Sequence, residues 1–453
     1  MNNRFLWSAT ELQSAFNQAD ISAGVNGISI DSRTTAPGDL FVALSGDPGP
    51  RFGGGDDNAR DGHDFIEMAV NAGASVVMIH RELTCAVPAI RVDDTLDGLW
   101  QLGSYARHRT LAKVAAITGS SGKTTLRTWL QGVLSSMVNC HASEGSLNNH
   151  WGVPLSLARM PAGSDVGLFE IGTNHPGEIE PLSRLVEPDV SVVLNVLPAH
   201  IGNFAGMEEL RTEKLSISQG LRSGGTLVVP ASLAENSTHS KILTFGKGGD
   251  VYAEGTPTGS GTEVRIDVAG TEIECQVPFV GTERIETIAA MFAILSALEI
   301  DPVQAAKHVS ALELPGGRGN LLEVGGVTII DDSYNANPVS MKMSLAHLGS
   351  MKNRKRRIAL LGEMLELGVA SKAAHQEMAR HLEGIDQVYT FGSGFSASSF
   401  ERQDHFETME EFDLEAFVQG LESGDSILVK GSNKVFWKNN FVNRLTGLID
   451  RRG

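Results

Sequence analysis

Short apolar runs alternate with stretches of helical periodicity through the middle of the chain. Residues 114–117, 165–169 and 190–194 are mostly apolar runs, which is typical of buried strands. Behind the first run, apolar side chains recur at helical spacing, at Leu126, Trp129, Leu130, Val133 and Leu134. Strands that alternate with helices predict a parallel sheet that is covered on both faces.

The part of the chain before these runs, residues 1–106, has a similar but shorter pattern. It predicts a helix at 65–72 and short strands at 28–30, 40–44 and 75–79. The first two strands flank a polar turn, and the stretch between residues 46 and 62 is rich in glycine, proline and aspartate, which indicates a loop. We expect a small α/β module here.

Strand-like runs return after residue 313, and helical stretches separate them. They lie at 327–330, 358–361, 388–391 and 427–429. Pro315-Gly-Gly317 is typical of a linker, and 453 residues are too many for one ordinary core. We therefore predict an α/β protein of three domains: a small N-terminal α/β module, a central parallel-sheet domain and a C-terminal Rossmann-like α/β domain, at 1–106, 107–313 and 314–453.

The last part of the central domain has a different pattern. Residues 264–268 and 272–277 alternate between apolar and polar with a period of two, and Gly270 lies between them. This predicts a hairpin. Residues 285–298 are largely apolar and predict a helix that closes the domain.

A glycine-rich segment directly follows the first central strand. It consists of Gly119, Ser120, Ser121, Gly122, Lys123, Thr124 and Thr125. Strand, glycine loop, lysine, hydroxyl and helix is the order of a phosphate-binding loop, in which backbone N–H groups and a helix N-terminus favour phosphate. Lys123 can neutralise the terminal phosphates and Thr124 can ligate Mg²⁺. Ile117 stands where the full pattern has glycine, and the alternative is a glycine turn that only opens a helix.

Polar residues follow the next two central strands. Glu170 comes directly after 165–169, and His200 comes a few residues after 190–194. Because ligands lie beyond the carboxyl ends of parallel strands, we expect the glycine-rich loop, Glu170 and His200 to converge. Mg²⁺ prefers carboxylate oxygen, which makes Glu170 a candidate metal ligand. The alternatives are a surface or capping role for Glu170 and an ordinary loop position for His200.

Composition and charge narrow the class of protein. Hydrophobic residues make up 41% of the chain, and the net charge of −17 argues against a general nucleic-acid binder. Cys85, Cys140 and Cys275 are odd in number and far apart, so neither a disulfide framework nor a zinc site is expected. We expect a cytoplasmic protein, because the sequence shows neither a signal-peptide core nor a membrane-spanning run. The basic run 354–357 is interpreted as a solvated loop rather than a binding patch.

Several motifs resemble the ATP-dependent Mur ligases of bacterial cell-wall synthesis, in the same order along nearly the whole chain. The most specific are Glu170-Ile-Gly-Thr-Asn-His-Pro-Gly-Glu-Ile179 and Asp331-Asp-Ser-Tyr-Asn-Ala-Asn-Pro338. The others are the glycine-rich loop, 31–44, 61–65, 147–154, Gly317-Arg318 and 362–368. The resemblance implies a first domain that binds a UDP-sugar, a second that binds ATP and a third that brings the incoming amine.

The resemblance also implies an activity. The expected enzyme is an ATP-dependent amide ligase that adds D-alanyl-D-alanine to UDP-N-acetylmuramoyl-tripeptide through an acyl-phosphate, in peptidoglycan precursor synthesis. ATP and Mg²⁺ are the expected cofactors, both substrates are small molecules, and a monomer is expected. Catalysis of this kind needs no protein nucleophile, because positioning and charge neutralisation are sufficient.

Site residues follow from the motifs. The resemblance implies that Lys123 and Thr124 hold the ATP phosphates and a first Mg²⁺, and that Glu170 and His200 hold a second. Lys214 corresponds to a lysine that many relatives carry in a CO₂-modified form, although it could equally be a plain surface lysine. The expected nucleotide contacts in the C-terminal domain are Arg318 and Asp332, with Asp332 on the ribose. The expected substrate contacts are Ser32, Arg33, Asn148, Asn149, Asn174, Asn335 and Asn337, although Arg33 could simply pair with Asp31 or Asp39.

Two segments depart from the family pattern. Relatives usually carry a His-Asn pair and a further Asn that contact adenine, where this chain has Glu283, Arg284 and Thr287. Arg284 can stack on the adenine face instead of hydrogen-bonding its edge. Asn433 stands where relatives usually have arginine. A divergent ligase that joins a different amine, and a non-catalytic nucleotide-binding regulator, are therefore the alternatives.

Overall fold

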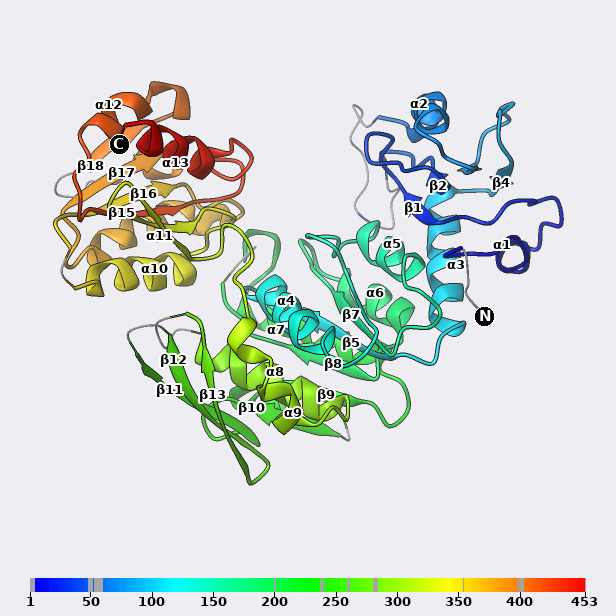
Figure 1. The fold of residues 1–453 in the computed structure, drawn as a ribbon, viewed down its shortest axis with the longest axis horizontal. Coiled ribbons are helices and arrows are strands. Elements are labelled where there is room, and N and C mark those ends of the chain that lie inside the picture. The colour runs from blue at the N-terminus through cyan, green and yellow to red at the C-terminus, as the bar shows by residue number, and fades with distance from the viewer. Residues whose placement is uncertain are drawn as a thin grey trace.

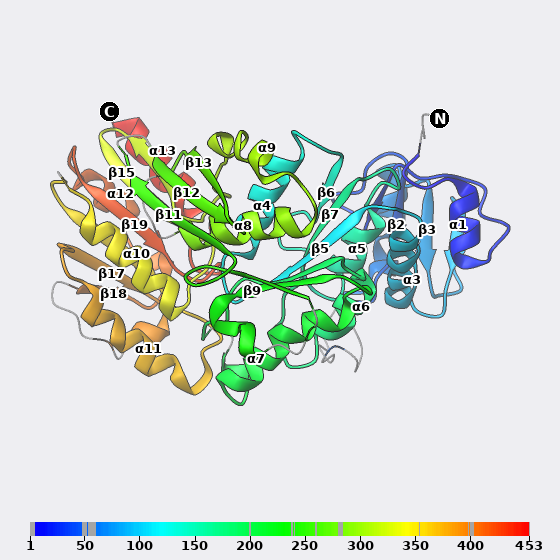
Figure 2. The same cartoon turned by 90° about the horizontal axis from the view of Figure 1, so that it is seen from below.

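The computed structural model describes residues 5–47, 52, 60–198, 201–236, 239, 241–258, 261–279, 284–352, 354–396, 398 and 403–452. Three α/β bodies follow one another in chain order, from the blue N-terminal body to the red C-terminal one (Figure 1, Figure 2). Each contains its own sheet, and most strand pairs in these sheets are parallel. The α/β class with three domains that the sequence predicted is confirmed.

The N-terminal sheet has four parallel strands in the order β1-β2-β3-β4. They are β1 (Gly27–Ser29), β2 (Asp39–Val42), β3 (Val76–Ile79) and β4 (Ala89–Arg91), and the helices are α1 (Ala9–Phe16), α2 (Ile66–Asn71) and α3 (Thr95–His108). Because β1 and β2 are parallel, the stretch between them is a crossover connection and not a simple polar turn between two strands.

The central sheet has nine strands in the order β13-β12-β11-β10-β9-β8-β5-β7-β6. They are β5 (Lys113–Thr118), β6 (Cys140–Ala142), β7 (Val166–Glu170), β8 (Val190–Val193), β9 (Thr226–Pro230), β10 (Ile242–Phe245), β11 (Val251–Pro257), β12 (Thr262–Val268) and β13 (Thr271–Val277). The predicted hairpin is confirmed as β12–β13. Ala269 and Gly270 have φ of 49° and 89°, as a two-residue turn with left-handed residues requires.

Helices cover both faces of the central sheet. One face packs against α4 (Lys123–Leu134) and α8 (Ile285–Ala297), which bury their apolar side chains on strands β5, β7 and β8. The other face packs against α5 (Gly152–Ala158) and α6 (Ile179–Val186), together with α3. The remaining helices of this domain are α7 (Met207–Leu215) and α9 (Pro302–Ala306).

The C-terminal sheet has six strands in the order β14-β15-β19-β16-β17-β18, and β14 alone is antiparallel to its neighbour. The strands are β14 (Asn320–Val324), β15 (Val327–Asp332), β16 (Arg357–Gly362), β17 (Gln387–Phe391), β18 (Gln403–Phe406) and β19 (Ser426–Lys430). Its helices are α10 (Pro338–Ser350), α11 (Ser371–Glu377), α12 (Leu414–Gln419) and α13 (Phe441–Arg452). α10 and α11 pack on one face of the sheet, and α12 and α13 pack on the other.

Helix α3 anchors the N-terminal domain to the central one. Its Arg107 is fully buried and donates hydrogen bonds to the carbonyl oxygens of Val186 and Glu187, both at 3.0 Å. Arg107 also pairs with Asp189 at 3.1 Å. A buried guanidinium needs such partners, so this helix has one defined position on the central sheet.

Two glycines bring the central and C-terminal domains into backbone contact. A Cβ atom on Gly202 would lie 2.6 Å from the backbone nitrogen of Gly368, and a Cβ atom on Gly368 would lie 2.8 Å from the Cα of Gly202. Because the atoms met are backbone atoms, no side-chain rotation can relieve either clash. The domains approach this closely because both positions are glycine.

The substitution Gly202→Ala is expected to separate these two segments without unfolding either domain. Amide hydrogen exchange should become faster in residues 201–203 and 366–370 and stay unchanged in the sheets. The matched control is Gly163→Ala, since a Cβ atom there meets nothing within 4 Å. Unchanged exchange in both segments of the Gly202 variant would contradict this contact.

Candidate active site

A cavity of about 650 Å³ lies between the central and C-terminal domains. Its wall includes the glycine-rich loop, Glu170 and Lys214 from the central domain, and Arg318 and Asp332 from the C-terminal domain. Among the described residues, the structure therefore brings most of the predicted site into one place. His200 lies outside the described residues, so its predicted metal contact stays a prediction.

The glycine-rich loop has the backbone that its sequence predicts. Gly119 and Gly122 have φ of 156° and 79°, and Gly122 is the N-cap of α4. A Cβ atom at either glycine would approach the Leu194 side chain to 3.0 Å, and the positive φ would strain any larger residue at these positions. The ammonium of Lys123 donates to the carbonyl oxygen of Gly119 at 2.7 Å.

Asn195 supports this loop in a way that the sequence did not reveal. Its Oδ1 accepts hydrogen bonds from the backbone N–H groups of Ser120 and Ser121, both at 3.0 Å. Its amide nitrogen donates to the carbonyl oxygen of Ser121 at 3.1 Å. The only signal in the sequence is its position directly after a strand that turns out to neighbour β5.

Glu170 lies at the centre of the site. Glu170 is 2% exposed, and its Oε2 accepts a hydrogen bond from Thr124 Oγ1 at 2.9 Å. Its Oε1 accepts one from the Asn148 amide, also at 2.9 Å. Arg127 Nε lies 3.8 Å from Oε2 and was not identified from the sequence. These contacts exclude the simple surface role for Glu170.

Thr124 and Glu170 also offer a suitable pair of metal ligands. Hydroxyl and carboxylate oxygens are hard donors of the kind that Mg²⁺ takes, and here they are adjacent at the N-terminus of α4. Arg318 Nη2 donates to Thr124 Oγ1 at 3.1 Å, which brings a C-terminal cation to the same point. The two oxygens fit Mg²⁺ by donor type, and Arg318 would have to move away from Thr124 for the ion to bind there.

Desolvation lowers the pKa of Lys123. The nearby Glu170 carboxylate opposes this shift, and the Arg318 guanidinium adds to it. The Lys123 ammonium is poorly hydrated, and the Arg318 guanidinium repels it. A phosphate bound between these two cations would relieve their repulsion, so the site favours an anion.

Lys214 is buried, with a relative exposure of 2%. This burial lowers the pKa of its ammonium to about 7. Lys123 adds to this shift, whereas Glu213 and Glu178 oppose it. Glu213 itself caps α6 by accepting hydrogen bonds from the N–H groups of Gly177, Glu178 and Ile179. Lys214 is therefore not a plain surface lysine.

The predicted substrate residues fall into two groups. Asn148, Asn149, Asn174, Asn335 and Asn337 line the cavity. Asn149 and Asn337 also accept hydrogen bonds from backbone N–H groups at the starts of α5 and α10. Ser32 and Arg33 belong to the N-terminal domain and do not line the cavity, and Arg33 pairs with Asp31 at 2.6 Å.

The positions that depart from the family pattern at the adenine motif also reach the cavity. Arg284 and Thr287 line it, whereas Glu283 lies outside the described residues. The Arg284 guanidinium donates to the carbonyl oxygen of Arg318 at 3.2 Å. It also lies 6.0 Å from the centre of the Phe279 ring, which stacks on Trp129.

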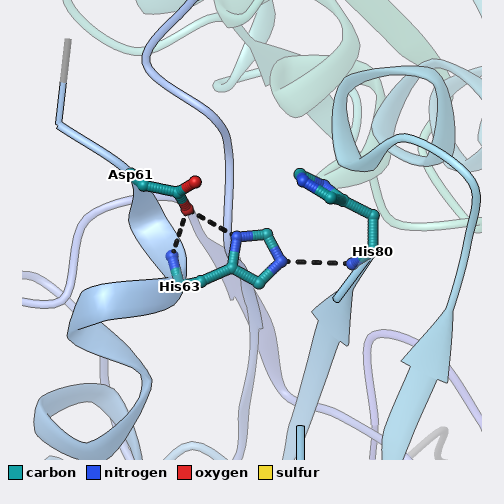
Figure 3. Close-up of side chains that lie close together, drawn as sticks. All are labelled: Asp61, His63 and His80. Carbon is teal, nitrogen blue, oxygen red and sulfur yellow. Dashed lines mark hydrogen bonds and ion pairs between the residues drawn. The ribbon is translucent and has the colours of Figure 1, made fainter. Parts of the chain in front are cut away.

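A second group of possible metal ligands lies in the N-terminal domain, and Figure 3 shows it. The ligand atoms of Asp61, His63 and His80 all lie within 4.8 Å of one another. However, His63 Nδ1 contacts Asp61 Oδ1 at 2.6 Å, and His63 Nε2 accepts the backbone N–H of His80 at 3.1 Å. Both ring nitrogens of His63 already have partners, so these contacts hold the 3₁₀ helix Gly62–Phe65, which directly precedes α2, against the end of β3.

Comparison with known proteins places this architecture in a family. The family model described as the Mur ligase middle domain matches residues 117–295, and the model described as the Mur ligase, glutamate ligase domain matches residues 317–433. The chain belongs to the Mur ligase family. It is an ATP-dependent ligase of the kind that forms peptide bonds.

Matches to individual proteins are more specific than the matches to the two family models. The chain is 31% identical over 425 residues to the UDP-N-acetylmuramoyl-tripeptide–D-alanyl-D-alanine ligase of Bacillus subtilis, and the match covers 90% of each chain. The crystal structure of MurF from Acinetobacter baumannii has a TM-score of 0.84 at 28% identity, covering 97% of this chain and 99% of that one. MurF from Thermotoga maritima in complex with ADP has a TM-score of 0.80 at 25% identity, covering 94% and 98%. No described helix is long and apolar enough to cross a membrane.

The shifted pKa of Lys214 predicts a pH dependence of stability. An unfolded lysine keeps its proton until about pH 10.4, whereas the folded one loses it near 7, so the unfolded state binds more protons between these values. In CO₂-free buffer, the unfolding free energy of the wild type should therefore rise relative to Lys214→Met from about pH 7 upward. The rise is at most about 1.4 kcal/mol per pH unit.

Urea unfolding at pH 7 and pH 9 measures this difference. The exposed Lys434 provides the control, because Lys434→Met should show no comparable change with pH. A constant difference between the wild type and Lys214→Met would show that Lys214 keeps an ordinary pKa.

Proposed function

We propose that this ligase adds D-alanyl-D-alanine to UDP-N-acetylmuramoyl-tripeptide at the expense of ATP, through an acyl-phosphate, as a cytoplasmic monomer. The name of the Bacillus subtilis relative states this activity. The observation that carries the proposal is the meeting of Lys123, Thr124, Glu170 and Arg318 in one cavity between two domains. Such a site can hold a triphosphate against a second substrate.

The reaction has two steps. A carboxylate oxygen of the tripeptide attacks the terminal phosphorus of ATP, and ADP leaves. The amine of D-alanyl-D-alanine then attacks the acyl carbon, loses a proton, and phosphate leaves. Lys123 and Arg318 neutralise the charge on the transferred group, and the N–H groups at the start of α4 orient it.

Thr124 would hold a first Mg²⁺ in this site, and Glu170 would hold a second, with His200 proposed as a further ligand of the second ion. When bound, Mg²⁺ supplies positive charge that stabilises the phosphoryl oxygens. Asn148 fixes the second oxygen of Glu170, so the first oxygen is presented in a single orientation. Ordering this carboxylate before the substrates arrive lowers the entropic cost of binding.

Lys214 is proposed to carry a CO₂-derived carbamate. With a pKa of about 7, a large share of its side chain is the neutral amine at neutral pH. The neutral amine forms the N–C bond with CO₂ and releases one proton, which leaves a carbamate anion. Starting from the ammonium form, two protons are released in all, and a buried cation is replaced by an anion. The anion would face Lys123, whose ammonium presently repels that of Lys214.

Closure of the C-terminal domain is proposed to keep water from the acyl-phosphate. Gly317, with φ of 69°, lies in the Pro315–Gly317 linker that joins the two domains. A Cβ atom there would lie 2.7 Å from the Trp437 ring, so the linker has little room for a larger residue.

A ligase that joins a different amine is the second candidate. Arg284, Thr287 and Asn433 line the cavity at positions that differ from the family pattern, and they favour a changed nucleotide or acceptor contact. A non-catalytic regulator is disfavoured, since the phosphate loop, Thr124 and Glu170 keep a connected arrangement.

Phosphate release from ATP tests the proposed function. With UDP-N-acetylmuramoyl-tripeptide present, release should require D-alanyl-D-alanine, and other amines should not replace it. The variant Lys123→Ala should lose at least about 100-fold in kcat because it loses the charge at the transferred phosphoryl group. Lys113→Ala, at the opposite end of β5, is the control, and near-normal turnover by Lys123→Ala would overturn the site assignment.

Depletion of CO₂ tests the proposed modification of Lys214. Turnover in degassed buffer at pH 7.5 should fall and return on addition of bicarbonate. Labelled ¹³C-bicarbonate should give a carbamate signal that Lys214→Ala lacks. If the wild type shows full turnover and no such signal, Lys214 acts as an unmodified amine.

A further inference from the structure

A buried ion pair joins the carboxyl ends of two adjacent strands in the C-terminal sheet. Lys430 ends β19, Asp332 ends β15, and the two residues are register neighbours. Lys430 Nζ lies 2.6 Å from Asp332 Oδ2 and donates to the carbonyl oxygen of Asn335 at 3.1 Å. Since Lys430 is 1% exposed, its ammonium depends on these partners in place of water.

A second donor reaches the same carboxylate oxygen. Ser344 of α10 donates to Asp332 Oδ2 at 2.6 Å. None of the described residues makes a hydrogen bond to Asp332 Oδ1. Asp332 lines the cavity, and its side chain is 21% exposed. One oxygen is thus fixed inside the domain, and the other is left available in the cavity wall.

We propose that Lys430 and Ser344 are positioning residues for the nucleotide. They fix the Asp332 carboxylate through Oδ2, so that Oδ1 can accept a hydrogen bond from a ribose hydroxyl. This inference rests on the proposed function, in which Asp332 contacts the ribose of ATP. A hydrogen bond to a charged acceptor is strong only when its geometry is held, and two donors on one oxygen hold it.

A purely structural ion pair would behave differently. Its loss would lower stability and could lower activity, but it would do so equally for every nucleotide. A positioning role instead predicts that the preference for a nucleotide with both ribose hydroxyls depends on Lys430 and Ser344. The ratio of kcat/KM values for ATP and for its deoxy analogues separates these two readings.

The experiment measures kcat/KM of the full-length ligase with ATP, 2′-deoxyATP and 3′-deoxyATP. For the wild type, the more affected analogue should be about 10- to 100-fold poorer than ATP, as expected for one hydrogen bond to a charged group. Lys430→Met should reduce this ratio to about 3-fold or less by lowering kcat/KM for ATP. Ser344→Ala, a smaller change that spares the ion pair, should give an intermediate ratio.

Two controls separate the possible failures. Asp332→Asn should lose most of the preference, and the exposed-lysine variant Lys434→Met should keep it in full. A wild type that uses all three nucleotides equally would refute the ribose contact of Asp332, and with it the basis of this inference. A wild-type preference that persists in both Lys430→Met and Ser344→Ala would leave the ribose contact intact and overturn the positioning role. If Lys430→Met does not fold, the Ser344→Ala ratio decides.

Discussion

The arrangement of the site depends on one buried carboxylate. Glu170 accepts hydrogen bonds from Thr124 of the phosphate loop and from Asn148 of the segment before α5, and Arg127 is nearby. An isolated carboxylate at this depth would be strongly unfavourable, so these groups have to assemble together. The loop that would hold ATP and the segment that would face the peptide are therefore fixed to each other through a single side chain.

The C-terminal domain joins this assembly through Arg318. Its guanidinium stacks over the Tyr334 ring at 4.2 Å and donates to Thr124 Oγ1. Thr124 is thus shared between Glu170 of its own domain and an arginine that directly follows the linker. Since a hydroxyl can donate only one hydrogen bond, its single proton goes to Glu170, and it accepts from Arg318. Movement of the C-terminal domain therefore changes the surroundings of a proposed metal ligand directly.

The sequence predicted the long central strands and the meeting of the glycine-rich loop with Glu170, because apolar runs mark buried parallel strands and their carboxyl ends share one edge. Short strands such as β4, β6 and β18 were missed, since three or four residues give no distinct periodicity. Asn195 and Lys430 were also missed as site residues. Their roles depend on which strands are neighbours, and β19 lies between β15 and β16, which the order along the chain does not reveal.

The support of the phosphate loop by Asn195 has a consequence for selectivity. The N–H groups of Ser120 and Ser121 already donate hydrogen bonds to the Asn195 side chain, so an anion can bind them only by replacing Asn195. A ligand that takes either group has to offer more than Asn195 does, and a single small oxyanion gains little by the exchange. A polyphosphate that also engages Lys123 compensates for the lost bonds. Asn195 therefore competes with a single small oxyanion for these two N–H groups more effectively than with a polyphosphate.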